Sequence, residues 1–371
     1  MGARNVMKKS AAVLSVAVLM MLGTEIYVRW AMSQDALTYT PGMLEKVPPL
    51  RYRLTPGFRG EISWPGRYRA SVAVNSLGLR GPEVLPKQPG DFRVLALGDS
   101  FTFGIGVEVA DTYVARLTKL APPNGPRVVT LNGGVPGYGV PDALAFLEEY
   151  GLALEPDLVL VSILLGNDIL DATERGRVDW ADGLPAAGAN RGLVLWLFRH
   201  SHFFRWALRA NLGRLVGLPD SWQVSYVRDM LVTTSDDSSP LTQEGRENSR
   251  QALAALAALS KHHGFRLGVV LIPTKLQLDP ESARRLFEWL DVDPTTFDAE
   301  ATDRFFTTVL RDYGIPFLNL RSTLKQETDT GDPLFIPDDG HFTPRGHEVA
   351  AGAICNFLVT ERLLESPSEL E

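Results

Sequence analysis

The chain contains a single cysteine, Cys355, among its 371 residues. An intrachain disulfide needs two cysteines and a thiolate zinc site needs several, so the sequence excludes both. Cys355 lies in the apolar stretch AAGAICNFLV, whereas a thiol nucleophile needs an electropositive and accessible setting. We therefore expect this side chain to pack in a core.

An excess of positive charge is also absent. The chain has 37 Lys and Arg against 44 Asp and Glu, a net charge of -7, and a sequence pI of about 5.5. Proteins that bind nucleic acid do so largely through clustered positive charge, so no nucleic-acid partner is expected. Apolar residues make up 45% of the chain, which is typical of a globular protein with one sizeable core.

The N-terminus resembles an export signal. Basic residues at Arg4, Lys8 and Lys9 precede an apolar run over residues 11–22, as in the charged and apolar regions of a secretion signal. The run is shorter than the roughly 20 residues of a spanning helix, but residues 26–30 can extend it. No convincing small-x-small cleavage site follows it.

We therefore expect residues 1–30 to form an uncleaved anchor in the inner membrane, with a cleaved signal peptide as the alternative. Most of the chain would then lie on the extracytoplasmic side, either periplasmic or at the cell surface. Protein partners cannot be derived from these features.

Composition and pattern predict three more parts after residues 1–30. Residues 31–90 are rich in Pro and Gly and contain only short extended candidates such as RYRASVAV, which predicts a loop-rich extension. Residues 91–362 carry the pattern of a catalytic domain, interrupted by an insertion at about residues 172–242. A short tail, residues 363–371, ends the chain.

The domain alternates between strand and helix patterns. Five β-branched and apolar runs predict strands: RVLALG, RVVTLN, DLVLVSI, RLGVVLI and PFLNL. Stretches of helical periodicity lie between and after them: ADTYVARLTKL, PDALAFLEEYGL, ENSRQALAALAALSKHH, DRFFTTVLRDYG and PRGHEVAAGAICNFLV. This alternation predicts an α/β sandwich with a parallel sheet and helices on both faces.

The insertion contains one long amphipathic segment, RGLVLWLFRHSHFFRWALRANLGRLV. Its arginines alternate with apolar residues at helical spacing: Leu197, Phe204, Leu208, Leu212 and Leu215. A helix that covers the core is the simplest interpretation. A lid over the site and a helix on the membrane surface are the two alternatives.

Polar residues that follow the strands indicate where chemistry occurs, because ligands of a parallel α/β sheet bind beyond the carboxyl ends of the strands. Ser100 follows the first strand in the sequence Gly-Asp-Ser. A serine attacks a carbonyl only with a base within hydrogen-bonding reach, and a carboxylate commonly orients that base.

His341 is the best candidate for the base among six histidines. It lies in the loop PDDGHF, directly before a helix whose start is indicated by Thr343 as cap and Pro344 in the first turn. The other five lie in the insertion, at a helix end on the opposite edge of the sheet, or inside the last helix: His200, His202, His262, His263 and His347.

Two further loops supply candidate oxyanion donors. Residues 132–139 read NGGVPGYG, and glycines there let backbone N–H groups approach a ligand, which makes Gly137 a candidate. The third strand ends in Gly-Asn-Asp, and the side-chain amide of Asn167 can donate to a developing oxyanion. Such a donor contributes about 3 kcal/mol in comparable serine enzymes.

At these residues the sequence resembles the SGNH or GDSL hydrolases, over about residues 73–357. The four blocks are Gly-Asp-Ser, the glycine loop, Gly-Asn-Asp and Asp-Gly-His. Flanking strings are similar to those of a bacterial, often membrane-anchored branch: NSLGLRGPE, RVLALGDSFTFGIGV, NGGVPGYG, IPTKLQLDP and DGHFTPRGHEVAA.

The resemblance implies a flavodoxin-like three-layer fold with a five-stranded parallel sheet and no cofactor. It further implies that Ser100 is the nucleophile and an oxyanion donor through its N–H. Gly137 and Asn167 would be the other oxyanion donors, and His341 the base.

The triad acid is ambiguous between two neighbouring aspartates. Asp338 stands three residues before the histidine, where the superfamily most often has its acid, whereas Asp339 gives the D-x-H spacing of the alginate-type acetyltransferases. Phe342 follows the histidine, as an aromatic residue does in that D-x-H form. We therefore favour Asp339.

Other enzyme classes fit less well. Gly104-Ile105-Gly106 lacks the third glycine of a dinucleotide-binding loop, since Val109 stands at that position. A dinuclear metallophosphoesterase needs clustered carboxylate and imidazole ligands, which the sequence does not offer, so no metal is expected. Paired carboxylates for glycoside hydrolysis would have to face each other across a cleft, but Asp338 and Asp339 share one loop.

The sequence therefore predicts a carboxylic-ester hydrolase that forms an acyl-enzyme on Ser100. Its substrate would be an acyl ester, such as an acetyl ester, of a small molecule, a glycan or a lipid. An O-acyltransferase with the same triad, acting on an extracytoplasmic glycan, is the main alternative. A catalytically silent binding module of the same fold is a third hypothesis.

Overall fold

The computed structural model of the chain describes residues 2–31, 42–64, 66–120, 126–176, 180–181, 184–185, 201–204, 222–235, 238–328, 331–337 and 339–365. Much of the predicted insertion lies outside these ranges. Four of the five apolar positions expected along its helix are therefore not described: Leu197, Leu208, Leu212 and Leu215.

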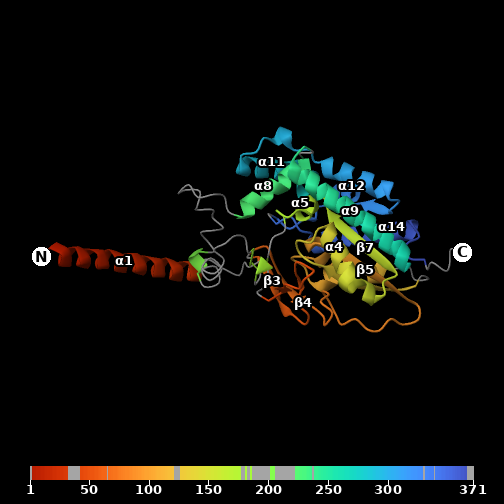
Figure 1. Ribbon diagram of the computed structural model, residues 1–371, viewed down its shortest axis with the longest axis horizontal. Coiled ribbons are helices and arrows are strands. Elements are labelled where there is room, and N and C mark those ends of the chain that lie inside the picture. The colour runs from red at the N-terminus through yellow and green to blue at the C-terminus, as the bar shows by residue number, and fades with distance from the viewer. Residues whose placement is uncertain are drawn as a thin grey trace.

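Five parallel strands form the central sheet, in the order β11-β10-β7-β5-β6; β5 and β7 are labelled in Figure 1. They are β5 (Asp91–Gly98), β6 (Arg127–Gly134), β7 (Leu158–Leu164), β10 (Arg266–Ile272) and β11 (Phe317–Asn319). Each overlaps one of the five predicted runs, so the predicted sheet is confirmed. The second strand continues two residues past its predicted end, because Gly133 and Gly134 still pair with β5.

Burial on both faces explains why these runs form strands. Every residue of β7, LVLVSIL, is buried, as expected for a strand of a parallel sheet covered by helices on both sides. Successive side chains of a strand point to opposite faces. Each strand therefore contributes to two separate hydrophobic clusters.

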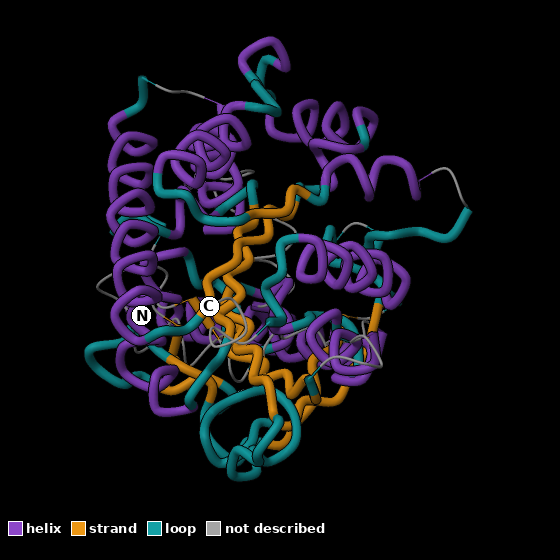
Figure 2. The backbone as a smooth tube through the Cα atoms, turned by 90° about the vertical axis from the view of Figure 1, so that its right-hand side faces the viewer, coloured by secondary structure: helices purple, strands orange, loops and turns teal. Residues whose placement is uncertain are grey.

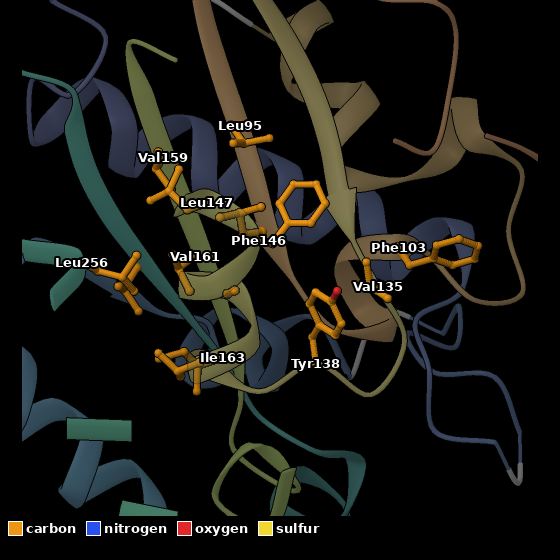
Figure 3. Close-up of a cluster of buried hydrophobic side chains, with 14 of the residues drawn as sticks. Leu95, Phe103, Val135, Tyr138, Phe146, Leu147, Val159, Val161, Ile163 and Leu256 are labelled. Carbon is orange, nitrogen blue, oxygen red and sulfur yellow. The ribbon is translucent and has the colours of Figure 1, made fainter. Parts of the chain in front are cut away.

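On one face, the sheet packs against α4 (Val140–Phe146), α9 (Pro240–His263) and α12 (Ala301–Asp312). Leu95 and Val161 of the strands lie in one buried cluster with Phe146 and Leu256 of these helices (Figure 3). The helices thus cover much of this face of the sheet.

On the opposite face, the sheet packs against α3 (Tyr113–Leu120), α13 (Arg321–Glu327) and α14 (Pro344–Thr360). Val94 and Leu160 lie in the buried cluster on that side, and Cys355 of α14 packs against the same cluster from a partly exposed position. The predicted three-layer α/β/α fold is therefore confirmed, with strands between two groups of helices (Figure 2).

The N-terminal region adds antiparallel pairs to this core: β1 (Leu44–Glu45) with β2 (Arg53–Leu54), and β3 (Arg59–Trp64) with β4 (Tyr68–Ala73). Its buried side chains, among them Tyr52 and Ile62, belong to the same cluster as Leu95. The region thus packs directly on the side of the sheet that α4 covers.

Helix α1 (Gly2–Ala31) extends away from the rest of the fold in Figure 1. Among the residues that the structure describes, no helix has both the length and the apolar character that a membrane crossing requires. The predicted membrane anchor thus gains no support from the structure.

The remaining elements lie around the sheet, mostly beyond the carboxyl ends of the strands. They are α2 (Ser100–Phe103), α5 (Asp168–Asp171), α8 (Trp222–Ser235), α10 (Lys275–Leu278), α11 (Pro280–Leu290), β8 (Trp180–Ala181) and β9 (Leu184–Pro185).

The order of the strands locates the binding crevice of the sheet. The chain leaves β5 toward β6 on one side of β5 and then crosses to β7 on the other side. The crevice between β5 and β7 is therefore the topological switch point, where open α/β sheets bind ligands.

Gly134, the last residue of β6, lies against the backbone of α2. A Cβ at Gly134 would lie 2.6 Å from the carbonyl carbon of Thr102 and closer still to the backbone nitrogen of Phe103. Backbone atoms cannot rotate away, so Gly134→Ala must shift β6 or α2. We expect the substitution to lower the free energy of unfolding by about 1–3 kcal/mol, measured by urea denaturation.

Gly352→Ala is the matched control for this prediction. A Cβ at Gly352, inside α14, would meet nothing within 4 Å. Alanine is favoured over glycine in a helix by up to about 1 kcal/mol, so this variant should be at least as stable as the parent protein. Equal losses in the two variants would contradict the close approach at Gly134.

Candidate active site

Ser100 lies at the switch point, at the first residue of α2 and immediately beyond β5. The carboxylate of Asp99 caps this helix by accepting the N–H of Phe101 at 2.9 Å. Gly98 has a φ of +149°, and a Cβ there would lie 2.5 Å from Thr102 Oγ1 and 2.8 Å from the carbonyl oxygen of Ser162. Only glycine fits this turn, which places the serine at the carboxyl end of the sheet.

His341 reaches Ser100 from the loop before α14. Its Nε2 lies 2.8 Å from Ser100 Oγ, and its ring lies 5.1 Å from the ring of Phe101 between centroids. Its carbonyl oxygen accepts the N–H of Ile336 at 2.7 Å. The next residue, Phe342, forms an antiparallel bridge to Phe335, so the two ends of the loop that carries His341 are held together.

Asp339 Oδ1 accepts two hydrogen bonds from His341. The backbone N–H of His341 donates to it at 3.0 Å, and the ring Nδ1 lies within short hydrogen-bonding distance. With Nδ1–H directed at Asp339, Nε2 is left as the acceptor for the hydroxyl of Ser100. The structure thus brings Ser100, His341 and Asp339 together, while Asp338 lies outside the described residues.

Opposing effects set the proton affinity of this pair. Burial lowers the pKa of His341, but the negative charge of Asp339 and its hydrogen bond raise it more, so the net pKa lies above the ordinary 6.5. Burial raises the pKa of Asp339, yet the charge and hydrogen bonds of His341 bring it below its ordinary value. The histidine therefore holds a proton strongly once it receives one.

Two more carboxyl groups are buried behind the serine. Burial raises the pKa of Asp99 to about 6, against the N–H of Phe101 and the charge of His341, which lower it. Burial, followed by the charges of Asp99 and Asp171, raises the pKa of Asp168 well above its ordinary range. The charge on Asp99 in turn helps to raise the pKa of His341.

The candidate oxyanion donors line the same cavity as Ser100. Gly137 belongs to the loop after β6 and Asn167 to the turn after β7, and both are among the lining residues. Ser100 is the first residue of α2, so its N–H is one of the helix-terminal donors that have no partner within the helix. The three residues therefore line one cavity.

The amide of Asn167 is oriented by two residues that sequence analysis did not identify. Its Nδ2 donates to Asp171 Oδ2 at 2.8 Å and lies 3.3 Å from the hydroxyl of Tyr226, which itself donates to Asp171 Oδ1 at 2.8 Å. The two amide hydrogens point in different directions.

A sequence signal existed for Asp171 but not for Tyr226. Asp171 stands four residues after Asn167 on a helix, a spacing at which side chains meet on one face. Tyr226 comes from α8, in the predicted insertion, and no local pattern relates it to the site.

His347 is buried away from Ser100 as a structural residue. Its ring accepts the N–H of Tyr113 at 3.2 Å, and burial lowers its pKa to about 3.

The cavity beside Ser100 has a volume of about 890 Å³. One wall comes from α8, α10 and α11 and is largely apolar: Val227, Met230, Leu276, Leu286 and Trp289. Trp289 is 55% exposed, and Lys275 and Arg285 add positive charge to this wall. Among the described residues, no group of three or more His, Cys, Asp or Glu could hold a metal ion.

Comparison with protein families gives two matches. The model of the GDSL-like Lipase/Acylhydrolase family matches residues 96–296, which is more than half of the chain. The model of the SGNH hydrolase-like domain of the acetyltransferase AlgX matches residues 229–369. No curated protein matches the sequence.

Solved structures include similar proteins at low identity. An alpha/beta hydrolase enzyme from the metagenome of Lake Arreo, Spain, is 15% identical with a TM-score of 0.42, covering 74% of this chain and 97% of its own. An acetylxylan esterase from Geobacillus stearothermophilus is 15% identical with a TM-score of 0.42, covering 72% and 94%.

The pKa of His341 provides a direct test of the Asp339 contact. Asp339→Asn removes the charge that raises this pKa and leaves the burial that lowers it, so the titration midpoint should move to lower pH. Proton NMR of the imidazole Cε1–H measures the midpoint, with the resonance assigned by its loss in His341→Gln. An unchanged midpoint would contradict the proposed pairing.

Asp99→Asn serves as the comparison variant. Asparagine can still cap α2, and the charge of Asp99 raises the pKa of His341 less than that of Asp339 does. The midpoint should therefore fall by less than in Asp339→Asn. The reverse order would indicate that Asp99, and not Asp339, dominates the charge around the ring.

Proposed function

The chain belongs to the GDSL-like Lipase/Acylhydrolase family, and we propose that it is a serine ester hydrolase with Ser100 as nucleophile. The observation that carries the proposal is the continuous line of hydrogen bonds from Ser100 through His341 to Asp339, open to a cavity of about 890 Å³. A nucleophile bonded to a base that a carboxylate orients is the arrangement required for acyl transfer.

In the first half of the reaction, His341 Nε2 accepts the proton of Ser100 as Oγ attacks the ester carbonyl. The tetrahedral intermediate collapses when the protonated histidine gives that proton to the departing alkoxide, and an acyl-enzyme remains on Ser100. Asp339 accepts Nδ1–H throughout, which fixes the ring and stabilises its charged form.

In the second half, water takes the place of the alcohol. His341 accepts a proton from the water while the water oxygen attacks the acyl carbonyl. It then gives this proton to Ser100 Oγ as the carboxylic acid leaves. We assign the oxyanion of both intermediates to the N–H groups of Ser100 and Gly137 and to the side-chain amide of Asn167.

The cavity supports an acyl ester as the class of substrate. Its volume lies in the range of pockets that enclose a small organic ligand, and the apolar residues of α8, α10 and α11 provide a surface for an acyl chain or a sugar ring. Glycan and lipid esters both suit this wall. The extracytoplasmic location remains a prediction from the N-terminal sequence.

A second candidate function is O-acyl transfer to a sugar hydroxyl. It is supported by the match of residues 229–369 to the domain of the acetyltransferase AlgX and by the D-x-H spacing of Asp339 and His341. The same acyl-enzyme would form, and an acceptor hydroxyl would replace water in the second half.

Ser100→Ala should abolish ester cleavage and leave the fold intact, because the alanine only removes the attacking oxygen. The expected loss in kcat is of the order of 10⁶-fold, as for nucleophile removal in other serine hydrolases. The measurement is the steady-state hydrolysis of p-nitrophenyl acetate, with circular dichroism to compare folding. A variant that cleaves the ester at the parent rate would disprove the assignment.

Ser260→Ala is the matched control. Ser260 lies near the end of α9, which precedes β10 and therefore lies at the amino edge of the sheet, and its hydroxyl donates to the carbonyl oxygen of Phe265 at 2.6 Å. Its loss should leave kcat unchanged. A comparable drop in both variants would indicate a general effect on the protein.

The distribution of product distinguishes the two candidate functions. The parent protein is incubated with acetyl to octanoyl p-nitrophenyl esters in the presence and absence of oligosaccharide acceptors, and mass spectrometry compares free acid with acylated sugar. A hydrolase releases acid at the same rate with or without acceptor. Formation of Ser100-dependent acyl sugar at the expense of acid would favour the acyltransferase.

A further inference from the structure

We infer that Arg51 is a positioning residue, which fixes the loop that carries Gly137 by bonding that loop from the N-terminal region. The inference rests on the proposed function, because the loop matters to catalysis only if Gly137 donates to an oxyanion. Neither the family matches nor the motif pattern points to this arginine, which lies well before Ser100 in the sequence.

The guanidinium of Arg51 contacts both the loop, at Gly137, and the first turn of α4, at Asp142. Its Nη2 donates to the carbonyl oxygen of Gly137 at 2.9 Å, and its Nε donates to Asp142 Oδ1 at 2.9 Å. A second short contact joins Nη2 to Asp142 Oδ2. This same oxygen accepts the N–H of Gly139 at 3.0 Å, so one ion pair holds the loop together with the first turn of α4.

Tyr52 adds contacts beside Arg51. Its hydroxyl donates to the carbonyl oxygen of Pro136 at 2.9 Å, and its own carbonyl oxygen accepts a short hydrogen bond from the hydroxyl of Tyr138. The loop residues on both sides of Gly137 are therefore bonded to the segment that contains Arg51. Tyr52 also lines the cavity, with Arg51 next to it in the chain.

Burial makes the ion pair strong enough to orient a backbone. The side chains of Arg51 and Asp142 are only 12% and 10% exposed, so water does little to screen the pair. A bidentate arginine–carboxylate pair also fixes direction as well as distance. Removing one partner leaves the other as an uncompensated buried charge.

The positive charge of Arg51 also acts on Asp171. Burial raises the pKa of Asp171 well above its ordinary range, and the charge of Arg51 opposes this rise. Asp171 accepts the amide hydrogen of Asn167. One arginine thus contacts the Gly137 loop directly and influences, through Asp171, the residue that holds the other donor.

The expected consequence is a loss in kcat at nearly constant KM. The carbonyl oxygen of Gly137 and its N–H belong to adjacent peptide planes, so a released carbonyl lets the N–H turn away from the oxyanion. Misplacement of a catalytic group by about 1 Å can cost 10²-fold in rate. Substrate binding, which depends on the apolar walls, is left largely unchanged.

The test compares Arg51→Ala, Arg51→Lys and Arg53→Ala in the full chain. Two readouts are used: kcat and KM for p-nitrophenyl acetate, and amide hydrogen exchange of the peptide that covers residues 134–142. Arg51→Ala should lose about 10²-fold in kcat and exchange at least about tenfold faster over this peptide. Arg51→Lys keeps the charge but not the fork of donors, so it should fall between Arg51→Ala and the parent.

Arg53 provides the matched control. It lies two residues further along the same segment and is also paired, with Nε donating to Glu45 Oε1 at 2.9 Å and the guanidinium 4.7 Å from the ring of Tyr150. Its partners lie outside residues 134–142. Arg53→Ala should therefore leave both the loop exchange and kcat close to the parent values.

The pH dependence separates this role from a general loss of structure. The acid limb of the pH profile of kcat/KM reports the pKa of His341, which Arg51 does not contact directly. In Arg51→Lys the midpoint of this limb should therefore stay at the parent pH while kcat falls. A limb that moves would indicate a disturbed His341 loop and would overturn the inference. Unchanged loop exchange or kcat in Arg51→Lys, which retains the buried charge and folds more readily than Arg51→Ala, would also overturn it.

Failure of the proposed function has a different signature. A parent protein without Ser100-dependent cleavage of esters refutes the hydrolase, and a catalytic role for Arg51 with it, even where the loop exchange responds to Arg51→Ala. An active parent whose Arg51 and Arg53 variants behave alike refutes only the role of Arg51.

Discussion

The hydrogen bond between Ser100 Oγ and His341 Nε2 joins residues 241 positions apart in the chain, and the chemistry of the site depends on it. The sheet fixes the first partner, since β5 ends at the turn that begins α2. The loop before α14 fixes the second, through the bridge between Phe335 and Phe342. Both loops rest on the cluster that buries Phe101 and Phe342. Packing of the sheet against α14 thus sets the distance between nucleophile and base.

Buried charge is the second constraint. Asp339 keeps its negative charge next to His341, whereas Asp99, the residue directly after β5, has a pKa of about 6. The two carboxyl groups act on one imidazole in the same direction, and burial opposes them. Because the net effect raises the pKa of His341, the ring accepts the serine proton readily but is neutral only above that raised value. The activity of the proposed hydrolase should therefore rise with pH through this range.

The fold and the central pair could be predicted because their signals are local. The central strands β5, β7 and β10 are almost wholly buried, and each of the five strands appears as a short, mainly apolar run. Ser100 and His341 stand at the strand end and helix start where ligands bind. The contribution of Arg51 and Tyr226 could not be predicted in this way. Each is a polar residue whose partner lies far along the chain, and neither helical periodicity nor strand alternation records such a contact. The sequence leaves two aspartates open for the opposite reason: Asp338 and Asp339 share one local pattern. The structure places Asp339 at His341, and Asp338 lies outside the described residues.

The residues that local motifs identify and those that only distant contacts identify come from different parts of the fold. The sheet and its motifs place Ser100 and His341, whereas segments outside the sheet hold the proposed oxyanion donors: the N-terminal region holds the Gly137 loop, and α8 contributes Tyr226 beside Asn167. Stabilisation of the oxyanion is usually the largest contribution to the rate of an acyl transfer. A family can therefore keep one sheet and one Ser-His pair while its members differ in rate and substrate, because the segments that hold the donors and form the apolar wall lie outside the shared core. In this chain the hydrogen bonds of Arg51 and Tyr226 connect those segments to Gly137 and to Asn167, the two proposed donors outside Ser100.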